Sequence, residues 1–280
     1  DHVGGGLYLK SGKDINVQNC SFMKNEGEYG AGLCILDAKY SVIVKSKFIE
    51  NLATFKGGAL YISKVDVCKI YAVFVIKNEA VDGRGGGLYF GKGKNIQLEN
   101  CSFVKNGDKC GSVCRQDGDK CGGVCIQDTK YSIIANIMFI QNYIIDFEGT
   151  TLLISKGDCI ITNSVFGSNV AKQKGGGLYI SDAKCLIRNS SFDNNIAKER
   201  GGGLYIYKGN TIHILDCNFT KNQGNYGGGL HIFSAKYSVL VNTKFTQNLA
   251  ADNGAALLIS NGSCVIINSV FDGNNAKGNG

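Results

Sequence analysis

The sequence predicts an all-β parallel solenoid of about ten coils, each 26–28 residues long. Three glycines followed by Leu-Tyr begin at Gly4, Gly85, Gly175 and Gly201. A Phe-x-x-Asn signal lies between such blocks and holds in nine of the ten coils. No stretch shows the 3.6-residue period of an amphipathic helix, so the repeating elements are predicted to be strands joined by turns.

Each coil is predicted to begin at a tight corner, because glycine adopts positive φ without strain. These corners are expected at Gly4, Gly30, Gly57, Gly85, Cys121, Gly149, Gly175, Gly201, Gly227 and Gly254.

Two apolar alternations follow each corner. In the first coil they are Leu7 with Leu9, and then Ile15 with Val17. A period of two indicates a strand with one buried face. The Phe comes next, and the Asn after it is expected to turn the chain by bonding to backbone or to the Asn of the next coil. We therefore expect three strands per coil, each paired with its equivalent one coil away.

Two irregularities interrupt the repeat. Residues 107–117 are nearly repeated by residues 118–128, which predicts an extra loop around 107–121, between the fourth and fifth coils. Phe74 lies four residues before Asn78 instead of three, which predicts a local distortion.

The length of the chain fits one repeat domain over residues 1–280, since each unit of a solenoid contacts only its neighbours. The chain starts and stops within the repeat, so we expect a fragment or a subunit whose ends another copy covers. No apolar run is long enough for a membrane span in this segment. The net charge of +7 comes from lysines spread over the turns, without a basic stripe interleaved with aromatics. This pattern argues against a nucleic-acid partner.

The repeat resembles that of the polymorphic outer-membrane proteins, which is marked by GGA[ILV] and FxxN in each coil. The resemblance is clearest at Asn163-Ser164-Val165-Phe166 with Asn169, followed by Gly175-Gly176-Gly177-Leu178. Gly57-Gly58-Ala59-Leu60 has the literal GGAL form. The resemblance covers almost the whole chain, and it implies a right-handed parallel β-helix of the pectin-lyase-like type and a surface-exposed passenger or adhesin.

No catalytic residue, metal site or cofactor is predicted. The acids fall mainly in turns, and no outward strand position carries acids on successive coils, as a two-carboxylate hydrolase would require. His213 and His231 lie on different strands without triad-like partners, and we interpret them as surface or strand-filling residues.

The cysteines leave several alternatives open. Cys110, Cys114, Cys121 and Cys125 cluster and could form loop disulfides, a zinc site or free thiols. Cys159 and Cys185 share one buried position on consecutive coils, with Cα atoms expected ~4.8 Å apart, inside the range for a disulfide.

The outward position of the first strand is the best candidate binding surface. It carries a column of aromatics on a flat sheet, which could bind sugar rings or another protein, although stacked tyrosines also stabilise a sheet. The column contains Tyr8, Tyr61, Tyr89, Tyr179 and Tyr205.

Five Asn-x-Ser/Thr sequons could carry glycans if the protein is secreted by a eukaryote. They are Asn19, Asn100, Asn189, Asn218 and Asn261.

These observations favour a non-enzymatic, extracellular or cell-surface structural or adhesive protein that assembles end to end into a filament. Open β-helix ends present unpaired strand edges that invite a further coil, and a protein or glycan ligand is also compatible with the tyrosine column. The alternative is a carbohydrate-active β-helix, a polysaccharide lyase or hydrolase, whose acids lie in loops.

Overall fold

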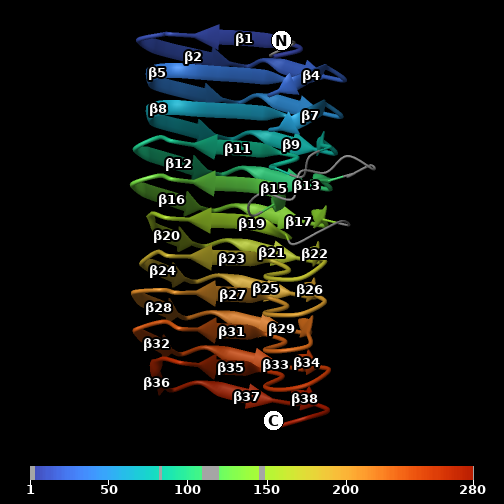
Figure 1. Ribbon diagram of the computed structural model, residues 1–280, viewed down its shortest axis with the longest axis vertical. Coiled ribbons are helices and arrows are strands. Elements are labelled where there is room, and N and C mark those ends of the chain that lie inside the picture. The colour runs from blue at the N-terminus through green and yellow to red at the C-terminus, as the bar shows by residue number, and fades with distance from the viewer. Residues whose placement is uncertain (1–3, 82–83, 109–119, 145–148, 280) are drawn as a thin grey trace.

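The coils stack into one rod, and each strand pairs in parallel with its equivalent on the next coil (Figure 1). The computed structural model describes residues 4–81, 84–108, 120–144 and 149–279. These residues form strands and turns without a helix, and the chain makes about nine turns between Leu7 and Leu257, which occupy equivalent positions. The predicted all-β parallel solenoid is confirmed.

The largest sheet has 18 strands and contains the first two strands of every coil. β5 (Leu33–Val44) and β8 (Leu60–Tyr71) run through both positions without a break. The other first strands are β1 (Leu7–Lys10), β11 (Leu88–Gly91), β15 (Lys120–Gln127), β19 (Gly149–Ser155), β23 (Leu178–Ser181), β27 (Leu204–Tyr207), β31 (Leu230–Phe233) and β35 (Leu257–Ser260). The other second strands are β2 (Asp14–Gln18), β12 (Asn95–Glu99), β16 (Tyr131–Ala135), β20 (Asp158–Thr162), β24 (Cys185–Arg188), β28 (Thr211–Leu215), β32 (Tyr237–Val241) and β36 (Ser263–Ile267).

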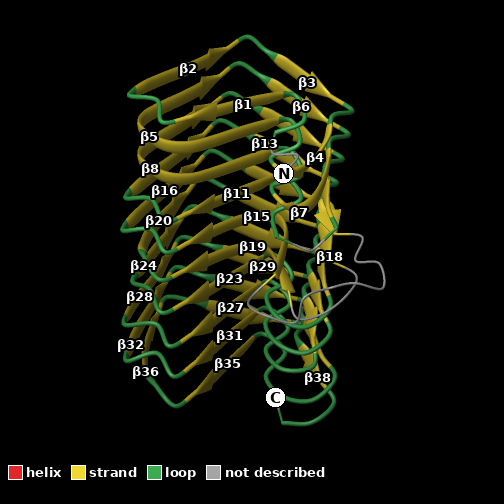
Figure 2. Ribbon diagram, turned by 45° about the horizontal axis from the view of Figure 1, so that its top comes forward, coloured by secondary structure: helices red, strands yellow, loops and turns green. Residues whose placement is uncertain are grey.

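Two further sheets of ten strands complete the coils (Figure 2). One of these two sheets holds the third strand of each coil and carries the Phe positions, and we call it the third sheet. Its strands are β3 (Ser21–Met23), β6 (Lys47–Ile49), β9 (Phe74–Ile76), β13 (Ser102–Val104), β17 (Met138–Ile140), β21 (Val165–Gly167), β25 (Ser191–Asp193), β29 (Asn218–Thr220), β33 (Lys244–Thr246) and β37 (Val270–Asp272). The fourth strands are β4 (Glu26–Tyr29), β7 (Leu52–Lys56), β10 (Glu79–Ala80), β14 (Gly107–Asp108), β18 (Tyr143–Ile144), β22 (Val170–Ala171), β26 (Ile196–Ala197), β30 (Gln223–Gly224), β34 (Leu249–Ala250) and β38 (Asn275–Ala276). The expectation of three strands per coil is wrong for most coils, because these fourth strands are too short to show a period.

One residue with positive φ stands at most corners of the coils. In the fourth coil these residues are Gly85 (φ 72°), Lys92 (φ 56°), Asn100 (φ 52°) and Lys105 (φ 55°). Asn and Gly tolerate this left-handed conformation best, which explains why they recur at corners. The predicted glycine corner is confirmed at Gly85, whereas Cys121 and Gly149 lie within strands.

The interior is one continuous core of aliphatic and aromatic columns. The rings of Phe166 and Phe192 stack with centroids 4.6 Å apart, and those of Phe192 and Phe219 follow at 4.7 Å. Beside them runs a ladder of buried asparagines, in which Asn169 donates to Asn195 at 2.9 Å. The predicted bonding of Asn to backbone and to the Asn of the next coil is confirmed.

The distortion predicted at Phe74 is wrong. Val75 takes the inward position, in register with Phe48 and Phe103, and Asn78 keeps its place in the ladder. Phe74 points outward and its side chain is 47% exposed. The coil therefore keeps its three-residue spacing, with a β-branched residue where the others have Phe. The predicted extra loop falls largely on residues 109–119, outside the described residues.

Candidate binding surfaces

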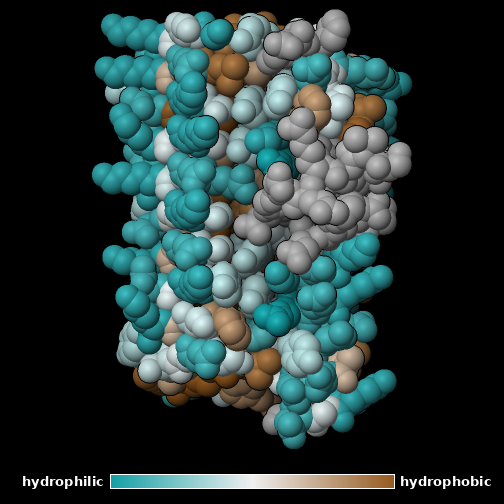
Figure 3. All heavy atoms as spheres, viewed as in Figure 1, coloured by the Kyte–Doolittle hydropathy of each residue, from teal (hydrophilic) through white to brown (hydrophobic). Residues whose placement is uncertain are grey.

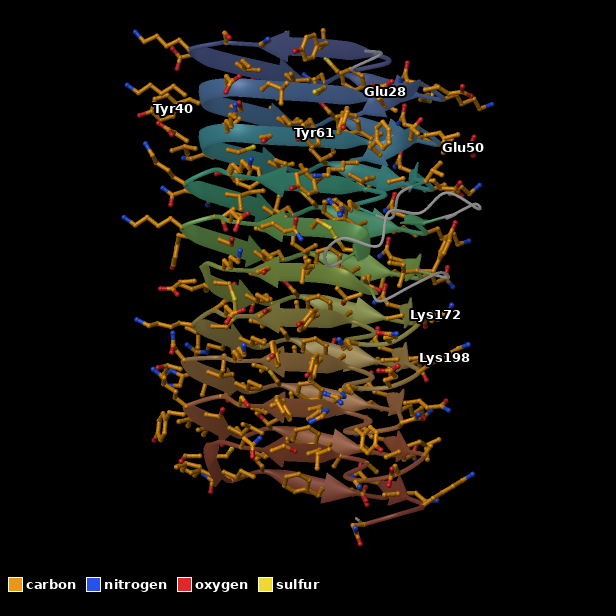
Figure 4. All side chains as sticks on the ribbon, in the orientation of Figure 1. Glu28, Tyr40, Glu50, Tyr61, Lys172 and Lys198 are labelled. Carbon is orange, nitrogen blue, oxygen red and sulfur yellow. A yellow bond between two sulfur atoms is a disulfide. The ribbon has the colours of Figure 1, made fainter. Side chains whose placement is uncertain are left out.

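The tyrosine column has the register that the sequence predicts. Tyr61 pairs with Tyr89, and Tyr179 pairs with Tyr205, with ring centroids 5.2 Å apart in both pairs. Figure 4 shows Tyr61 over the first strands of the 18-stranded sheet, with Tyr40 at one edge of the molecule and Glu50 at the other. The column therefore contains two stacked tyrosine pairs, which Cys125 and Leu153 separate, while Tyr8 pairs with Cys34.

The expected exposure of this column is wrong for most of its members. Tyr8 is 40% exposed, but Tyr89, Tyr179 and Tyr205 are only 8%, 7% and 2% exposed, and Tyr61 is half-buried. Residues just before corner glycines reach two of the rings. The Lys56 ammonium lies 4.6 Å from the Tyr89 ring centroid, and an Arg200 nitrogen donates to the Tyr205 hydroxyl at 3.5 Å. Burial raises the pKa of Tyr89 to about 12. Binding at the column stays a prediction, and any ligand would have to displace these covering side chains.

Sequence reasoning missed a different exposed surface, on the third sheet. The positions on either side of the buried Phe face outward, and in the first six coils they are mainly apolar. Met23, Phe74 and Met138 are 57%, 47% and 47% exposed. We call this surface the apolar face, and it consists of Met23, Ile49, Phe74, Ile76, Val104, Met138, Ile140 and Val165.

The apolar face ends abruptly along the rod. At the same two positions coils seven to nine carry Ser191, Asp193, Asn218, Thr220, Lys244 and Thr246. Lysines stand at the corner beside the apolar half, at Lys24, Lys77 and Lys105. The apolar residues that flank the Phe positions of the first six coils are visible in the sequence. The repeat, however, is defined by its inward positions, so it does not predict that the outward ones are apolar.

A groove of about 900 Å³ runs along the same six coils, between the sheet that carries the Phe positions and the sheet of fourth strands. Charged residues alternate along it: Lys77 pairs with Glu50 at 3.5 Å, and the Tyr143 hydroxyl donates to Glu79 at 3.0 Å. In the register, Glu26 and Glu79 flank Leu52, so two strand spacings, about 9.6 Å, separate their Cα atoms. At this strand position the first and third coils therefore carry an acid, and Leu52 lies between them.

The cysteines of the described residues are either disulfide-bonded or free thiols. Cys121 is bonded to Cys125, and Cys159 is bonded to Cys185 with their Cα atoms 4.7 Å apart. Cys110 and Cys114 lie outside the described residues. The other cysteines are buried or half-buried thiols, and burial raises the pKa of Cys34 to about 12. Such thiols are poor nucleophiles, because only the thiolate attacks.

The remaining candidates are dispersed. Within the described residues no group of three or more His, Cys, Asp or Glu has a geometry suited to a metal ion. His213 is half-buried on β28, whereas His231 on β31 is 3% exposed. The five sequon asparagines all have exposed side chains, and Asn19, Asn100 and Asn189 stand at the positive-φ corner after the second strand.

The parallel register, the continuous inner columns and the asparagine ladder define the class of protein: a parallel β-helix. The chain belongs to the family described as right-handed β-helix region, which it matches over residues 2–120 and 122–280. Comparisons with curated proteins and with solved structures gave no significant match. Among the described residues, no helix is long and apolar enough to cross a membrane.

Proposed function

We propose that this protein is a non-enzymatic β-helical rod of the cell surface or extracellular space, with a structural or adhesive role. The observation that carries the proposal is the apolar face, on which Phe74 and Met138 are each 47% exposed. Soluble monomers rarely expose contiguous apolar patches, and large ones mark interaction sites. Because the stacked coils hold the face in place, a partner would meet a preformed surface and lose little conformational entropy on binding.

The sequence supports the proposed location. The FxxN and Gly-Gly-Gly/Ala-Leu repeats resemble those of the polymorphic outer-membrane proteins, for which a surface-exposed passenger is expected. The exposed side chains of Asn19, Asn100 and the other sequons are also compatible with a glycosylated extracellular rod.

Adhesion by beads coated with the protein tests the proposal. Retention under flow is measured on a panel of immobilised proteins and glycans. The double variant Phe74→Lys/Ile76→Lys places charges on the apolar face, and we expect at least a tenfold drop in retained beads. Thr220→Lys is the matched control, because Thr220 occupies the register position of Ile76 in the polar half of the same sheet. Equal retention of both variants and the unmodified protein would overturn the proposal, provided that all three melt at similar temperatures.

We also propose end-to-end association into filaments. Ile266 and Phe271 belong to the inner columns, yet they are 43% and 48% exposed on the last coil, where apolar atoms gather at the lower end of Figure 3. A further coil, from this chain or from another copy, would bury them. Electron microscopy should show fibres that Phe271→Lys abolishes. Unchanged single rods at high concentration would refute association between copies.

The alternative, a carbohydrate-active enzyme, has one observation in its favour. The groove with Glu26, Glu50 and Glu79 is large enough for several sugar rings and contains carboxylates that could act as acid and base. Incubation with a panel of polysaccharides, followed by assay of new reducing ends and unsaturated uronides, distinguishes the two functions. Turnover that Glu79→Gln abolishes would replace the adhesive proposal with the enzymatic one.

A further inference from the structure

A small cavity opens on the outward side of the first strands in the last three coils, where the outward side chains become smaller. The tyrosine column continues from Tyr205 to His231 and then to Leu258. The neighbouring column continues from Tyr207 to Phe233 and then to Ser260. The loss of ring volume leaves a cavity of about 280 Å³. It is lined by Arg200, Tyr226, His231, Phe233, Asn253, Leu258 and Ser260.

His231 is the unusual member of this lining. Its side chain is 3% exposed, and neither ring nitrogen has a hydrogen-bond partner in the structure. Burial, followed by the nearby charge of Arg200, lowers the pKa of the imidazole to about 4, so the ring is neutral near pH 7. A neutral imidazole has one N–H donor and one nitrogen acceptor. Buried polar groups are normally satisfied, so this ring calls for an acceptor at its N–H and a donor at its other nitrogen.

A hydroxyl group can pair with either ring nitrogen, because it is both donor and acceptor, and a ligand with more than one hydroxyl group can meet both needs. The Tyr205 ring packs 5.2 Å from the His231 ring, and Phe233 packs edge-on to it at 6.3 Å. These rings hold the imidazole in a fixed orientation and form apolar walls. A carbon skeleton bearing hydroxyl groups would find both polar and apolar contacts here.

Arg200 supplies the only guanidinium of the lining. One of its nitrogens donates to the Tyr205 hydroxyl at 3.5 Å, and its carbon lies 5.8 Å from the Phe233 ring centroid. In the described part of the chain Arg200 forms no ion pair, and its fork of donors suits a carboxylate. Asn253 accepts the Asn279 backbone N–H through its side-chain oxygen at 2.7 Å, which leaves its amide N–H groups as further donors. Asp252, the chain neighbour of Asn253, is engaged with the Tyr226 hydroxyl, whose pKa this hydrogen bond raises.

We infer that this cavity binds a hydroxycarboxylate: a small molecule or glycan terminus that presents a carboxylate to Arg200 and a hydroxyl group to His231. The site is independent of the apolar face, which lies on a different sheet and in different coils. Its size suits a single sugar-sized ring.

Titration calorimetry with D-glucuronate tests the inference, with D-glucose and acetate as the two partial ligands. Glucuronate should bind at least tenfold more tightly than either, and it should shift the imidazole resonances of His231 but not those of His213. A disaccharide ending in glucuronate separates the sources: equal or tighter binding indicates a glycan terminus, and weaker binding indicates the free acid. Acetate binding as tightly as glucuronate, or an unshifted His231, would overturn the inference.

Variants separate binding from folding. His231→Leu copies the residue that Leu258 supplies at the same position one coil later, so it should fold with an equal or higher melting temperature and bind at least tenfold more weakly. His231→Gln keeps a donor and an acceptor, and it should retain affinity within a few fold. Arg200→Gln should lose at least tenfold, whereas Lys198→Gln, an exposed charge two residues away, should lose nothing. Full affinity in His231→Leu contradicts the assigned role.

Discussion

The side-chain amide of Asn195 donates to the Oδ1 atom of Asn222 at 3.0 Å, and the Asn195 backbone N–H donates to the same oxygen at 3.0 Å. Its Nδ2 also donates to the Phe166 carbonyl at 2.8 Å, on the coil before. One buried amide thus joins three coils. The same set of bonds recurs along the ladder, so the coils are held in register by polar contacts as well as by the apolar columns.

Replacement of Asn195 by Ala should be strongly destabilising. The change leaves the Phe166 carbonyl and the donors of Asn169 without partners in the core, and each buried unsatisfied group costs about 1–3 kcal/mol. We expect a loss of about 3–5 kcal/mol in the free energy of unfolding, measured by urea titration. Asn225→Ala, on an exposed turn, is the control and should change stability by less than about 0.5 kcal/mol. A loss below about 1 kcal/mol for Asn195→Ala would show that the ladder contributes little.

Two glycines of one coil should respond in opposite ways to alanine. A Cβ atom at Gly202 would collide with the backbone oxygens of Gln223 and Gly228, so Gly202→Ala should cost about 1–3 kcal/mol or more. At Gly224 the nearest atom would be 3.3 Å away, and the paired position on the next coil is Ala250. Gly224→Ala should therefore stabilise by about 0.4–1 kcal/mol through the unfolded state. Thermal unfolding of both variants checks the sign, and similar destabilisation by both would contradict the close backbone approach at Gly202.

Because Phe74 faces outward and Val75 faces inward on β9, a lysine should have very different effects at the two positions. Phe74→Lys puts a charge on an outward position that is 47% exposed and should change stability by less than about 1 kcal/mol. Val75→Lys puts the same charge between Phe48 and Phe103 in the core, and the variant should fail to fold or lose most of its stability. Circular dichroism and urea titration distinguish them. The reverse order would mean that Phe74, not Val75, faces inward.

Stability should fall as the pH is lowered through the range in which His231 titrates. The pKa of this residue is about 4 in the folded protein and near 6.5 when unfolded, so the unfolded state binds more protons between these values. The contribution is fully present above about pH 6.5 and is lost as the pH falls towards 4, by up to about 3 kcal/mol. His231→Leu should abolish this part of the dependence. Identical pH profiles for the two proteins, measured by urea titration, would show that the imidazole is not held neutral.

The candidate sites were harder to predict than the fold. The alternation at Tyr89 marks an outward residue in the fourth coil but says nothing of Lys56, which ends the second coil and covers the ring. The groove and the apolar face combine residues from six coils, and a search for acids at successive equivalent positions does not find carboxylates two coils apart. Phe74 points outward because the ladder fixes the inward position three residues before Asn78, whichever residue stands there.

The sequence by itself determined the parallel β-solenoid, most of its coil boundaries, the inward columns and the asparagine ladder. These follow from local chemistry repeated at a constant period, since glycine and asparagine allow the corners and alternating apolar residues must be buried. Only the tertiary structure decided which outward residues are accessible, how Arg200 and His231 come to line one cavity, and where the apolar face ends. Those properties depend on the volumes of side chains stacked from different coils, 26 or more residues apart in the chain, and no local pattern records them.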